Sequence, residues 1–360
     1  MVEPIYLKPK LGDKSPTATL IYGSSVLDAR LPDHSVHVVC AEFPVPGQSD
    51  GEAVQWPRFS YTPFVDSRPI KVAAQESVLG MEATVEEFIG HCVLAMRKVQ
   101  TFLRKDGTAW IYVRDRYLDN KQLGLIPTRV ALALQADGWV VRNDIIWAPD
   151  NPTGFGAHTD RLSQSHGTLF LLAHPESGGQ YFYNADPLRE AHKSQDEKHV
   201  KGYNKGTIMA GGWAKRPDLE KAWHPKGKNK GTVWKVNLGS YLGKSVSPWP
   251  YDLVEPMILA STPEKGVCAT CGTPPRVENG CWILSCGHND GFRPATVLDP
   301  FSGTATTGSA ALDHGRNYIG IDVNIASLPE AKSRLEGISQ SRKVRQRGES
   351  TPVLDMFKAE

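Results

Sequence analysis

The sequence has no long hydrophobic run, and this absence excludes the simplest membrane architectures. None of its apolar segments reaches the roughly 20 residues that a bilayer-spanning helix needs. Residues 1–10 also lack the apolar stretch of a secretory signal. We therefore expect a cytoplasmic protein with no membrane partner.

Cysteine is scarce, with six residues among 360, and four of the six fall between Cys268 and Cys286. In a reducing compartment such a local cluster favours metal ligation over disulfide bonds.

Net charge is almost absent as well, at +2 from 41 Lys and Arg against 39 Asp and Glu. This total says little about partners, because opposite local fields cancel in it. Residues 189–235 are different, with 12 Lys or Arg against 5 Asp or Glu and many Gly, Asn and aromatic residues. This segment either faces the phosphates of a nucleic acid or is a solvated insertion without a partner.

Short apolar strands alternate with amphipathic helices along most of the chain. With 360 residues, 40% of them hydrophobic, the chain is long enough to form one large core, or a main domain with a smaller attachment. The pattern predicts strands at 36–41, 107–113, 139–147, 169–173 and 295–298, and helices at 84–103, 126–136 and 252–260. This alternation indicates an α/β sheet covered by helices on both faces.

Residues 296–324, TVLDPFSGTATTGSAALDHGRNYIGIDVN, are typical of a ligand-binding unit. An apolar strand leads into a glycine-containing turn, a small-residue helix and a second strand. The turn lets a ligand approach backbone amides, and Asp322, about twenty residues on, suits ribose hydroxyls. Asp299 at the start of the turn would repel a pyrophosphate, but it can accept a hydrogen bond from the amino group of a methionine-type cofactor.

This unit resembles the DPFxGSGTT motif and the GRRFIGIDID-like strand of DNA amino-methyltransferases. The resemblance implies S-adenosylmethionine as the cofactor, with Asp322 on its ribose. One departure is Ala305, where the family has a second glycine, and its methyl group could crowd the cofactor. The residues implied in cofactor binding are Asp299, Pro300, Phe301, Ser302, Gly303, Thr304, Thr306, Thr307, Asp322, Trp249 and Pro250.

The resemblance covers most of residues 20–330. IPTRVALALQADGWVVRNDIIW at 126–147 is similar to the family's IPWRVALALQADGWYLRSDIIW, and WPYDLVEPMIL at 249–259 to the FPEKLVEPCIL segment that packs over the methionine end of the cofactor. The catalytic loop precedes the cofactor motif, which is the permuted order of the beta class of these enzymes. The implied fold is a Rossmann-like methyltransferase sheet with helices on both faces and a small zinc-ribbon-like insertion.

The domain organisation follows from this alignment. Residues 1–173 are expected to form the catalytic half, 174–244 the loops that recognise the DNA target, and 245–335 the cofactor-binding half with a cysteine-rich insertion at 266–290. Residues 336–360 are charged and poor in apolar side chains, so we expect a flexible tail there.

The loop after the first strand departs from the family, which has TSPPYW or DPPY there. In those motifs a Ser or Asp and a proline carbonyl accept the hydrogens of an exocyclic amino group, while Tyr stacks on a flipped base. This sequence has Glu42, Phe43 and Pro44 instead, and only Pro44 is retained. We predict that Glu42 accepts an amino hydrogen and that Phe43 stacks on the base. The alternative is a decayed loop that no longer supports methylation.

Three other residues are candidates for a catalytic role. Cys40 could attack cytosine as in carbon-methylating enzymes, but a cysteine within an apolar strand is more typical of a buried packing residue. Asp115 matches an aspartate that the family tends to carry after the next strand. His166 could contact the base or the DNA backbone, although a lone histidine is more often structural.

Cys268-x-x-Cys271 and Cys286-Gly-His288 supply four ligands from two turns, as a tetrahedral structural zinc requires. A similar cysteine ribbon occurs at this point in some amino-methyltransferases. Cys281 is a competing ligand, and packing of unmetallated thiols is the alternative. We assign no catalytic role to the metal.

The sequence therefore favours a DNA methyltransferase of restriction-modification type, which flips a base out of double-stranded DNA at a specific site and methylates its exocyclic amino group. Cytosine N4 and adenine N6 both stay open. The alternative from another class is a catalytically inactive DNA-binding or regulatory protein that retains the scaffold. RNA stays open as a partner, since attraction to phosphate does not discriminate the sugar. The sequence gives neither the recognition site nor the oligomeric state.

Overall fold

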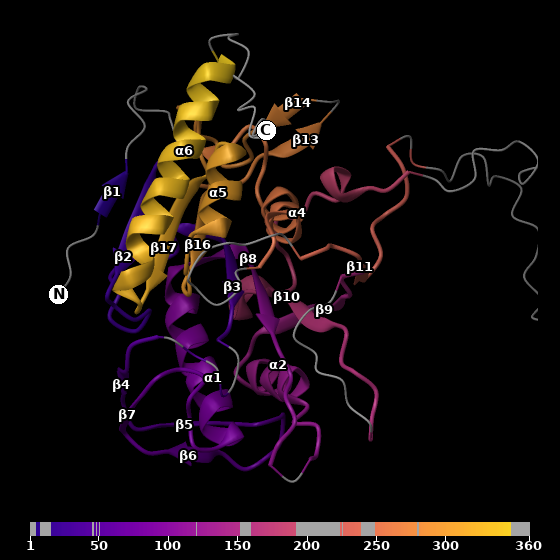
Figure 1. Ribbon diagram of the computed structural model, residues 1–360. Helices are drawn as coiled ribbons and strands as arrows, with labels where there is room; N and C mark the ends of the chain where they lie inside the picture. The colour runs from indigo at the N-terminus through magenta and orange to yellow at the C-terminus, as the bar shows by residue number, and fades with distance from the viewer. Residues whose placement is uncertain are drawn as a thin grey trace, which may run out of the picture.

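The computed structural model describes residues 5–7, 16–44, 47, 49, 51–119, 121–151, 160–191, 224, 226–238, 249–278 and 281–346. Across these residues the largest sheet has nine strands and forms the centre of the protein (Figure 1). In spatial order they are β1 (Ile5–Leu7), β2 (Ala18–Tyr22), β17 (Asn317–Asp322), β16 (Thr296–Asp299), β3 (Val36–Glu42), β8 (Leu103–Val113), β10 (Gly167–Ala173), β9 (Val140–Trp147) and β11 (Val233–Trp234).

The five strands from β2 to β8 run parallel to one another, whereas β1 and β10 pair antiparallel with the two outer strands of this group. At their centre β16 pairs with β3, although about 250 residues separate them in the sequence, with Val297 opposite Val38 and Leu298 opposite Val39. From this pair the chain moves in opposite directions, from β16 to β17 and from β3 to β8. In parallel α/β sheets such a reversal leaves a crevice at the carboxyl ends of the strands, where ligands bind.

Helices cover both faces of the sheet, as the alternation of elements predicted. On one face α1 (Val85–Phe102) packs against α2 (Ile126–Ala136), and on the other α5 (Thr306–Asp313) packs against both α4 (Tyr251–Ser261) and α6 (Leu328–Gln346) (Figure 1). Side chains of β3 alternate between the two cores: Val39 and Ala41 join the core under α1, whereas Val38 and Cys40 join the core under α4 and α5.

Four pairs of short strands lie outside the nine-stranded sheet among the described residues. Residues 51–79 form two short strand pairs beside α1, and 267–293 form the cysteine-rich insertion. The pairs are β4 (Val54–Trp56) with β7 (Gln75–Ser77), β5 (Phe59–Tyr61) with β6 (Ile70–Val72), β12 (Val267–Cys268) with β15 (Phe292–Arg293), and β13 (Arg276–Glu278) with β14 (Cys281–Ile283). Short 3-10 turns lie at Pro175–Ser177, Asp186–Leu188 and Ile325–Ser327.

Most predicted elements agree with the structure to within a few residues, but β1, β2, β11 and the short strands of the cysteine-rich insertion were not predicted. Two further regions differ. The strand pairs of residues 51–79 were not predicted, because strands of three residues carry no readable period. Helix α6 continues to Gln346, so the tail expected from residue 336 begins inside a helix; residues 347–360 lie outside the described residues. Within the described residues, no helix is both long and apolar enough to span a bilayer.

The close approach of α5 to β17 depends on Gly308. A Cβ atom there would lie 2.5 Å from Cε1 of Tyr318, which is 1% exposed and has no room to move aside. We expect Gly308→Ala to lower the free energy of unfolding by about 1–3 kcal/mol, measured by urea denaturation. Gly337→Ala in α6 is the control, because nothing lies within 4 Å of its added Cβ. Equal stability of the two variants would contradict this account of the packing.

Candidate active site

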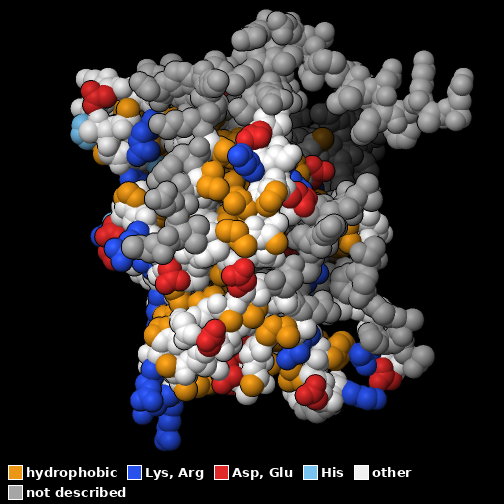
Figure 2. Space-filling view, turned by 60° about the vertical axis from the view of Figure 1, so that its left-hand side comes forward, with side chains coloured by type: hydrophobic (Ala, Val, Ile, Leu, Met, Phe, Trp, Pro, Cys, Tyr) orange, Lys and Arg blue, Asp and Glu red, His pale blue; other side chains and the backbone are white. Residues whose placement is uncertain are grey.

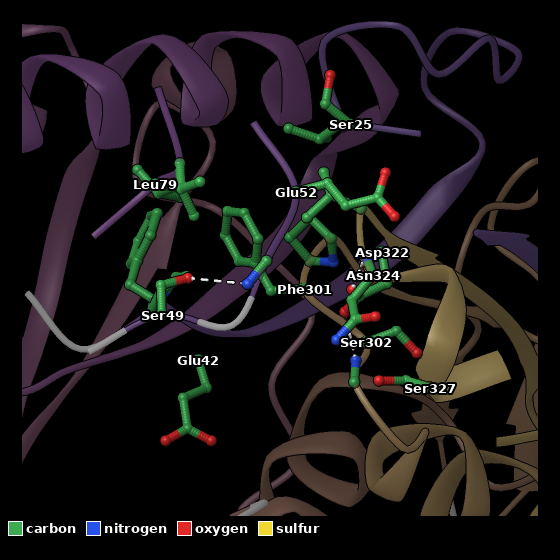
Figure 3. Close-up of a pocket in the computed structure, with 18 of the residues that line it drawn as sticks. Ser25, Glu42, Ser49, Glu52, Leu79, Phe301, Ser302, Asp322, Asn324 and Ser327 are labelled. Carbon is green, nitrogen blue, oxygen red and sulfur yellow. Dashed lines mark hydrogen bonds between the residues drawn. The ribbon is translucent and has the colours of Figure 1, made fainter. Parts of the chain in front are cut away.

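A cavity of about 170 Å³ opens where β3 and β16 end. Glu42 at the end of β3 and Phe43 and Pro44 just after it line one side, and the turn from Pro300 to Thr304 lines the cavity after β16. Figure 3 shows Glu42 on one side of this cavity and Asp322 and Asn324 together on the other, with Phe301 between them in this view. The loop after β3 and the turn after β16 therefore share one hollow although they lie far apart in the sequence.

The glycine turn after β16 is held from behind by buried hydroxyl groups. Ser302 Oγ lies 2.8 Å from the Tyr22 hydroxyl and 2.7 Å from the Tyr318 hydroxyl. The Tyr22 hydroxyl also donates to the carbonyl of Gly303, at 2.6 Å. Two neighbouring strands, β2 and β17, thus hold the turn in place.

Asp322 ties this turn to the end of β17. One of its carboxylate oxygens accepts from the backbone N–H of Gly303 at 2.6 Å, and the other accepts from that of Asn324 at 2.7 Å. Asp322 also lines the cavity. A carboxylate has about four acceptor positions and can accept several hydrogen bonds at once.

Asp299 has a different position from the one its motif suggests. Its carboxylate accepts from the N–H of Phe301 at 3.0 Å and from the hydroxyl of Thr307 at 2.6 Å, and it is not part of the cavity wall. Burial raises its pKa to about 7. In this structure Asp299 therefore supports the turn from inside.

Eight of the eleven residues implied in cofactor binding line the cavity, and Asp299, Thr307 and Pro250 do not. Ala305 is also absent from the wall. It adopts φ 60°, a left-handed conformation that explains the family's preference for glycine there, and its methyl group is buried in the core under α4 and α5. The crowding of a cofactor by this methyl group is therefore not seen.

Glu42 lies at the bottom of the cavity beside Arg114. Its Oε1 accepts from Nη2 of Arg114 at 3.2 Å, and its carboxylate also accepts from the backbone N–H of Trp249. Burial raises the pKa of Glu42, and Arg114 opposes this shift. Phe43 is fully buried, with its ring centroid 5.1 Å from that of Phe301 at a tilt of 47°.

Several residues that line the cavity were not predicted from the sequence. Arg114 follows β8 without any motif of its own, and Glu52 and Trp56 come from the strand pairs that were not predicted. Ser25 follows β2, and Asn324 follows β17. The signal that could have located Ser25, Arg114 and Asn324 is their place just after parallel strands, whose carboxyl ends share one edge of the sheet.

The other residues considered for catalysis lie elsewhere. Cys40 is fully buried in the core under α4, and burial raises the pKa of its thiol, which makes it a poor nucleophile. Asp115 accepts from the backbone N–H groups of Arg116 and Ile126, so it supports the start of α2. His166 is exposed and is not part of the cavity wall.

The four predicted metal ligands come together. The ligand atoms of Cys268, Cys271, Cys286 and His288 all lie within 4.8 Å of one another. Three thiols and one imidazole at such spacing fit a tetrahedral zinc ion. Arg104 donates to the carbonyl of Cys271 at 2.8 Å, which attaches the cluster to β8. None of the four lines the cavity, and the side chain of the competing Cys281 lies outside what the structure describes.

The raised pKa of Asp299 predicts a pH dependence of stability. Its pKa of about 7 in the folded protein exceeds its ordinary 3.8, so between pH 4 and pH 7 the folded chain holds a proton that the unfolded chain has released. Stability should therefore fall as pH rises through this window, by up to about 4 kcal/mol from this group. Asp299→Asn keeps an acceptor for Phe301 and should remove this part of the slope. Urea denaturation at pH 5 and pH 8 tests it, and equal slopes in both proteins would refute it.

Comparison with known proteins agrees with this geometry. The sequence model of the N6/N4 DNA methylase family matches residues 65–333. The type II methyltransferase M.Cfr9I of Citrobacter freundii is 27% identical over 288 residues, which cover 72% of this chain and 75% of that protein. M.SmaI of Serratia marcescens is 26% identical over 286 residues, covering 71% of this chain and 77% of that enzyme.

A solved structure shows a similar fold. The cytosine-N4-specific PvuII DNA methyltransferase superposes with a TM-score of 0.53 at 13% identity, covering 94% of this chain and 97% of that one. Its sheet architecture is the one predicted here, a Rossmann-like methyltransferase sheet with helices on both faces. The chain therefore belongs to the N6/N4 DNA methylase family, and the loop of Glu42 precedes the motif of Asp299 in its sequence, which is the order predicted for the beta class of that family.

Proposed function

We propose that this protein transfers a methyl group from S-adenosylmethionine to the exocyclic amino group of a cytosine or adenine flipped out of double-stranded DNA. The observation that carries the proposal is the single cavity between the turn after β16 and the loop after β3. Its relatives are type II methyltransferases, which supports site-specific modification of DNA in a restriction-modification system.

The cofactor residues fit a sulfonium nucleoside. Asp322 offers carboxylate oxygens to ribose hydroxyls, and Phe301 and Trp249 supply apolar surface for the methionine and base. Asp299 contributes by holding the turn, through Phe301 and Thr307. When bound, the cofactor would supply an electrophilic methyl group on a positively charged sulfur.

Glu42 is proposed to accept a hydrogen of the target amino group. The lone pair of this nitrogen is delocalised into the base, so the amino group needs an acceptor and alignment more than a strong base. Glu42 would take the proton that leaves the nitrogen as this nitrogen gains the methyl group, and the electron pair of the broken carbon–sulfur bond would stay with the departing thioether. Pro44 and Phe43 complete the pocket for the base. Because Phe301 covers the ring of Phe43, stacking on the base requires one of the two rings to turn.

The DNA-facing surface is proposed to include residues 174–244. Most of the basic residues in this range lie outside the described residues. Those described form ion pairs: Lys226 lies 2.8 Å from Asp186, and Lys228 lies 2.8 Å from Glu190. On the face in Figure 2, charged side chains of both signs are interspersed with hydrophobic ones among the described residues. Binding of DNA phosphates to Lys226 and Lys228 would therefore compete with the ion pairs that these lysines form with Asp186 and Glu190.

The altered loop favours one other candidate function. Only Pro44 of the usual motif is retained and Phe43 is fully buried, as expected of a scaffold that binds DNA without methylating it. Transfer of label separates the two candidates.

The test combines transfer with cofactor binding. The protein is incubated with methyl-tritiated cofactor and DNA of varied sequence, with RNA in parallel, and cofactor affinity is measured by calorimetry. We expect labelled DNA from the wild type. Glu42→Ala should keep the cofactor affinity and lose transfer, because it removes only the acceptor for the amino group. Asp299→Ala should lose cofactor binding, because the turn loses its support. Cofactor binding without transfer to any nucleic acid would favour the non-catalytic candidate.

The cysteine cluster is proposed to hold one structural zinc ion. Elemental analysis of the purified protein should find about one zinc per chain, and Cys271→Ser should lower this content and the melting temperature. Cys92→Ala is the control, because Cys92 is buried in α1, away from the cluster, and should keep the zinc. Wild-type protein purified without chelators but free of zinc would refute the assignment.

A further inference from the structure

We infer that Arg114 selects the target base. Together with Glu42 it presents to the cavity a pattern of hydrogen-bond donors and an acceptor that cytosine pairs with fully and adenine only in part. This inference rests on the proposed function, because it concerns the base that the same pocket receives.

Arg114 reaches the cavity because of its place in the sheet. It follows β8, the neighbour of β3, and the two strands stay paired up to Glu42 opposite Tyr112. Nη2 of Arg114 lies 3.2 Å from Oε1 of Glu42, and both side chains line the cavity while remaining 31% and 19% exposed. The pair is therefore shielded from solvent but open to a ligand.

The packing around Arg114 fixes its orientation. Its guanidinium carbon lies 5.6 Å from the centre of the Tyr112 ring. That ring is 4% exposed and meets Trp147 edge-on at 5.2 Å between centroids. Gly167 lies against it so closely that an added Cβ would overlap the Tyr112 hydroxyl. Tyr112 is thus a rigid support, and Arg114 has little freedom to turn away from Glu42.

The hydrogen-bonding pattern of the pair is that of guanine. A guanidinium carries five N–H donors in a planar fork. The contact with Glu42 uses one of them, and a hydrogen bond to the Tyr112 side chain uses a second. Nε is buried and has no hydrogen-bond partner among the described residues, so the donors left for a ligand are on the two terminal nitrogens. A carboxylate acceptor beside a fork of donors reproduces the order of O6, N1–H and N2–H along the pairing edge of guanine. Cytosine complements that order with its N4 amino group, N3 and O2.

Adenine matches only part of this edge. Its N6 amino group and N1 can meet the acceptor and one donor, but a C–H group stands where cytosine has O2. One N–H of Arg114 would then stay unpaired inside the closed pocket, and sites that leave a buried polar group unpaired discriminate strongly, by up to about 10⁴-fold. We expect a preference for cytosine of at least about 100-fold.

The positive charge of Arg114 also keeps Glu42 ready to accept a hydrogen. Burial raises the pKa of Glu42 and Arg114 opposes this rise. Without Arg114 the carboxylate should therefore protonate at higher pH. Since only the ionised form can take up the proton of the amino group, the acid limb of the transfer rate should move to higher pH in Arg114→Met.

The experiment identifies the methylated base. Wild-type protein, Arg114→Lys and Arg114→Met are incubated with tritiated cofactor and genomic DNA from a strain without DNA methylation. The DNA is digested to nucleosides, and the label in N4-methylcytosine and N6-methyladenine is counted. Arg114→Lys keeps a charge beside Glu42 but lacks the planar fork, so it tests the edge without leaving Glu42 unpaired. Arg142→Met, in β9 and outside the cavity wall, removes the same charge elsewhere.

The outcomes separate this inference from the proposed function. We expect the wild type and Arg142→Met to place the label in N4-methylcytosine. Both Arg114 variants should transfer at least tenfold less label, with a cofactor affinity by calorimetry that is unchanged. The transfer rate of Arg114→Met should also reach its plateau at a higher pH than that of the wild type. Label in N6-methyladenine, or full transfer by the Arg114 variants, would overturn the inference and leave amino-methylation standing. No label in any DNA would overturn both.

Discussion

The parallel pairing of β16 with β3 is the constraint on which the site depends. It places Val297 beside Val38 and Leu298 beside Val39, and so brings two turns to the same edge of the sheet. One turn carries the cofactor motif and the other carries Glu42. Because the chain leaves the two strands in opposite directions, the space above their ends stays free of crossover connections.

Rigid support of both turns makes this space a formed cavity. On the cofactor side, the Tyr22 and Tyr318 hydroxyls hold Ser302, and Asp322 holds Gly303. On the catalytic side, Arg114 holds Glu42. A preorganised site loses little conformational entropy when the ligand binds, and it keeps donors and acceptors where charge changes during the reaction.

The sequence was most informative where one short segment carries the whole feature. The apolar periods located α2 and β3, and the run around Asp299 and Asp322 located the cofactor half of the cavity. Prediction failed where contacts between segments that are distant in the sequence determine which residues reach the cavity. Nothing near Arg114 indicates its contact with Glu42, because that contact depends on the pairing of β3 with β8. Asp299 shows a different limit: the motif identified the residue, but it did not indicate that the carboxylate forms hydrogen bonds with Phe301 and Thr307 inside the turn.

The central claim is that a single cavity holds the cofactor beside the target base. A crystal structure of the protein with S-adenosylhomocysteine, the demethylated cofactor, tests this most directly. The account predicts the ribose at Asp322 and the sulfur directed toward Glu42. A nucleoside bound away from Asp322, or a sulfur separated from Glu42 by protein, would contradict it.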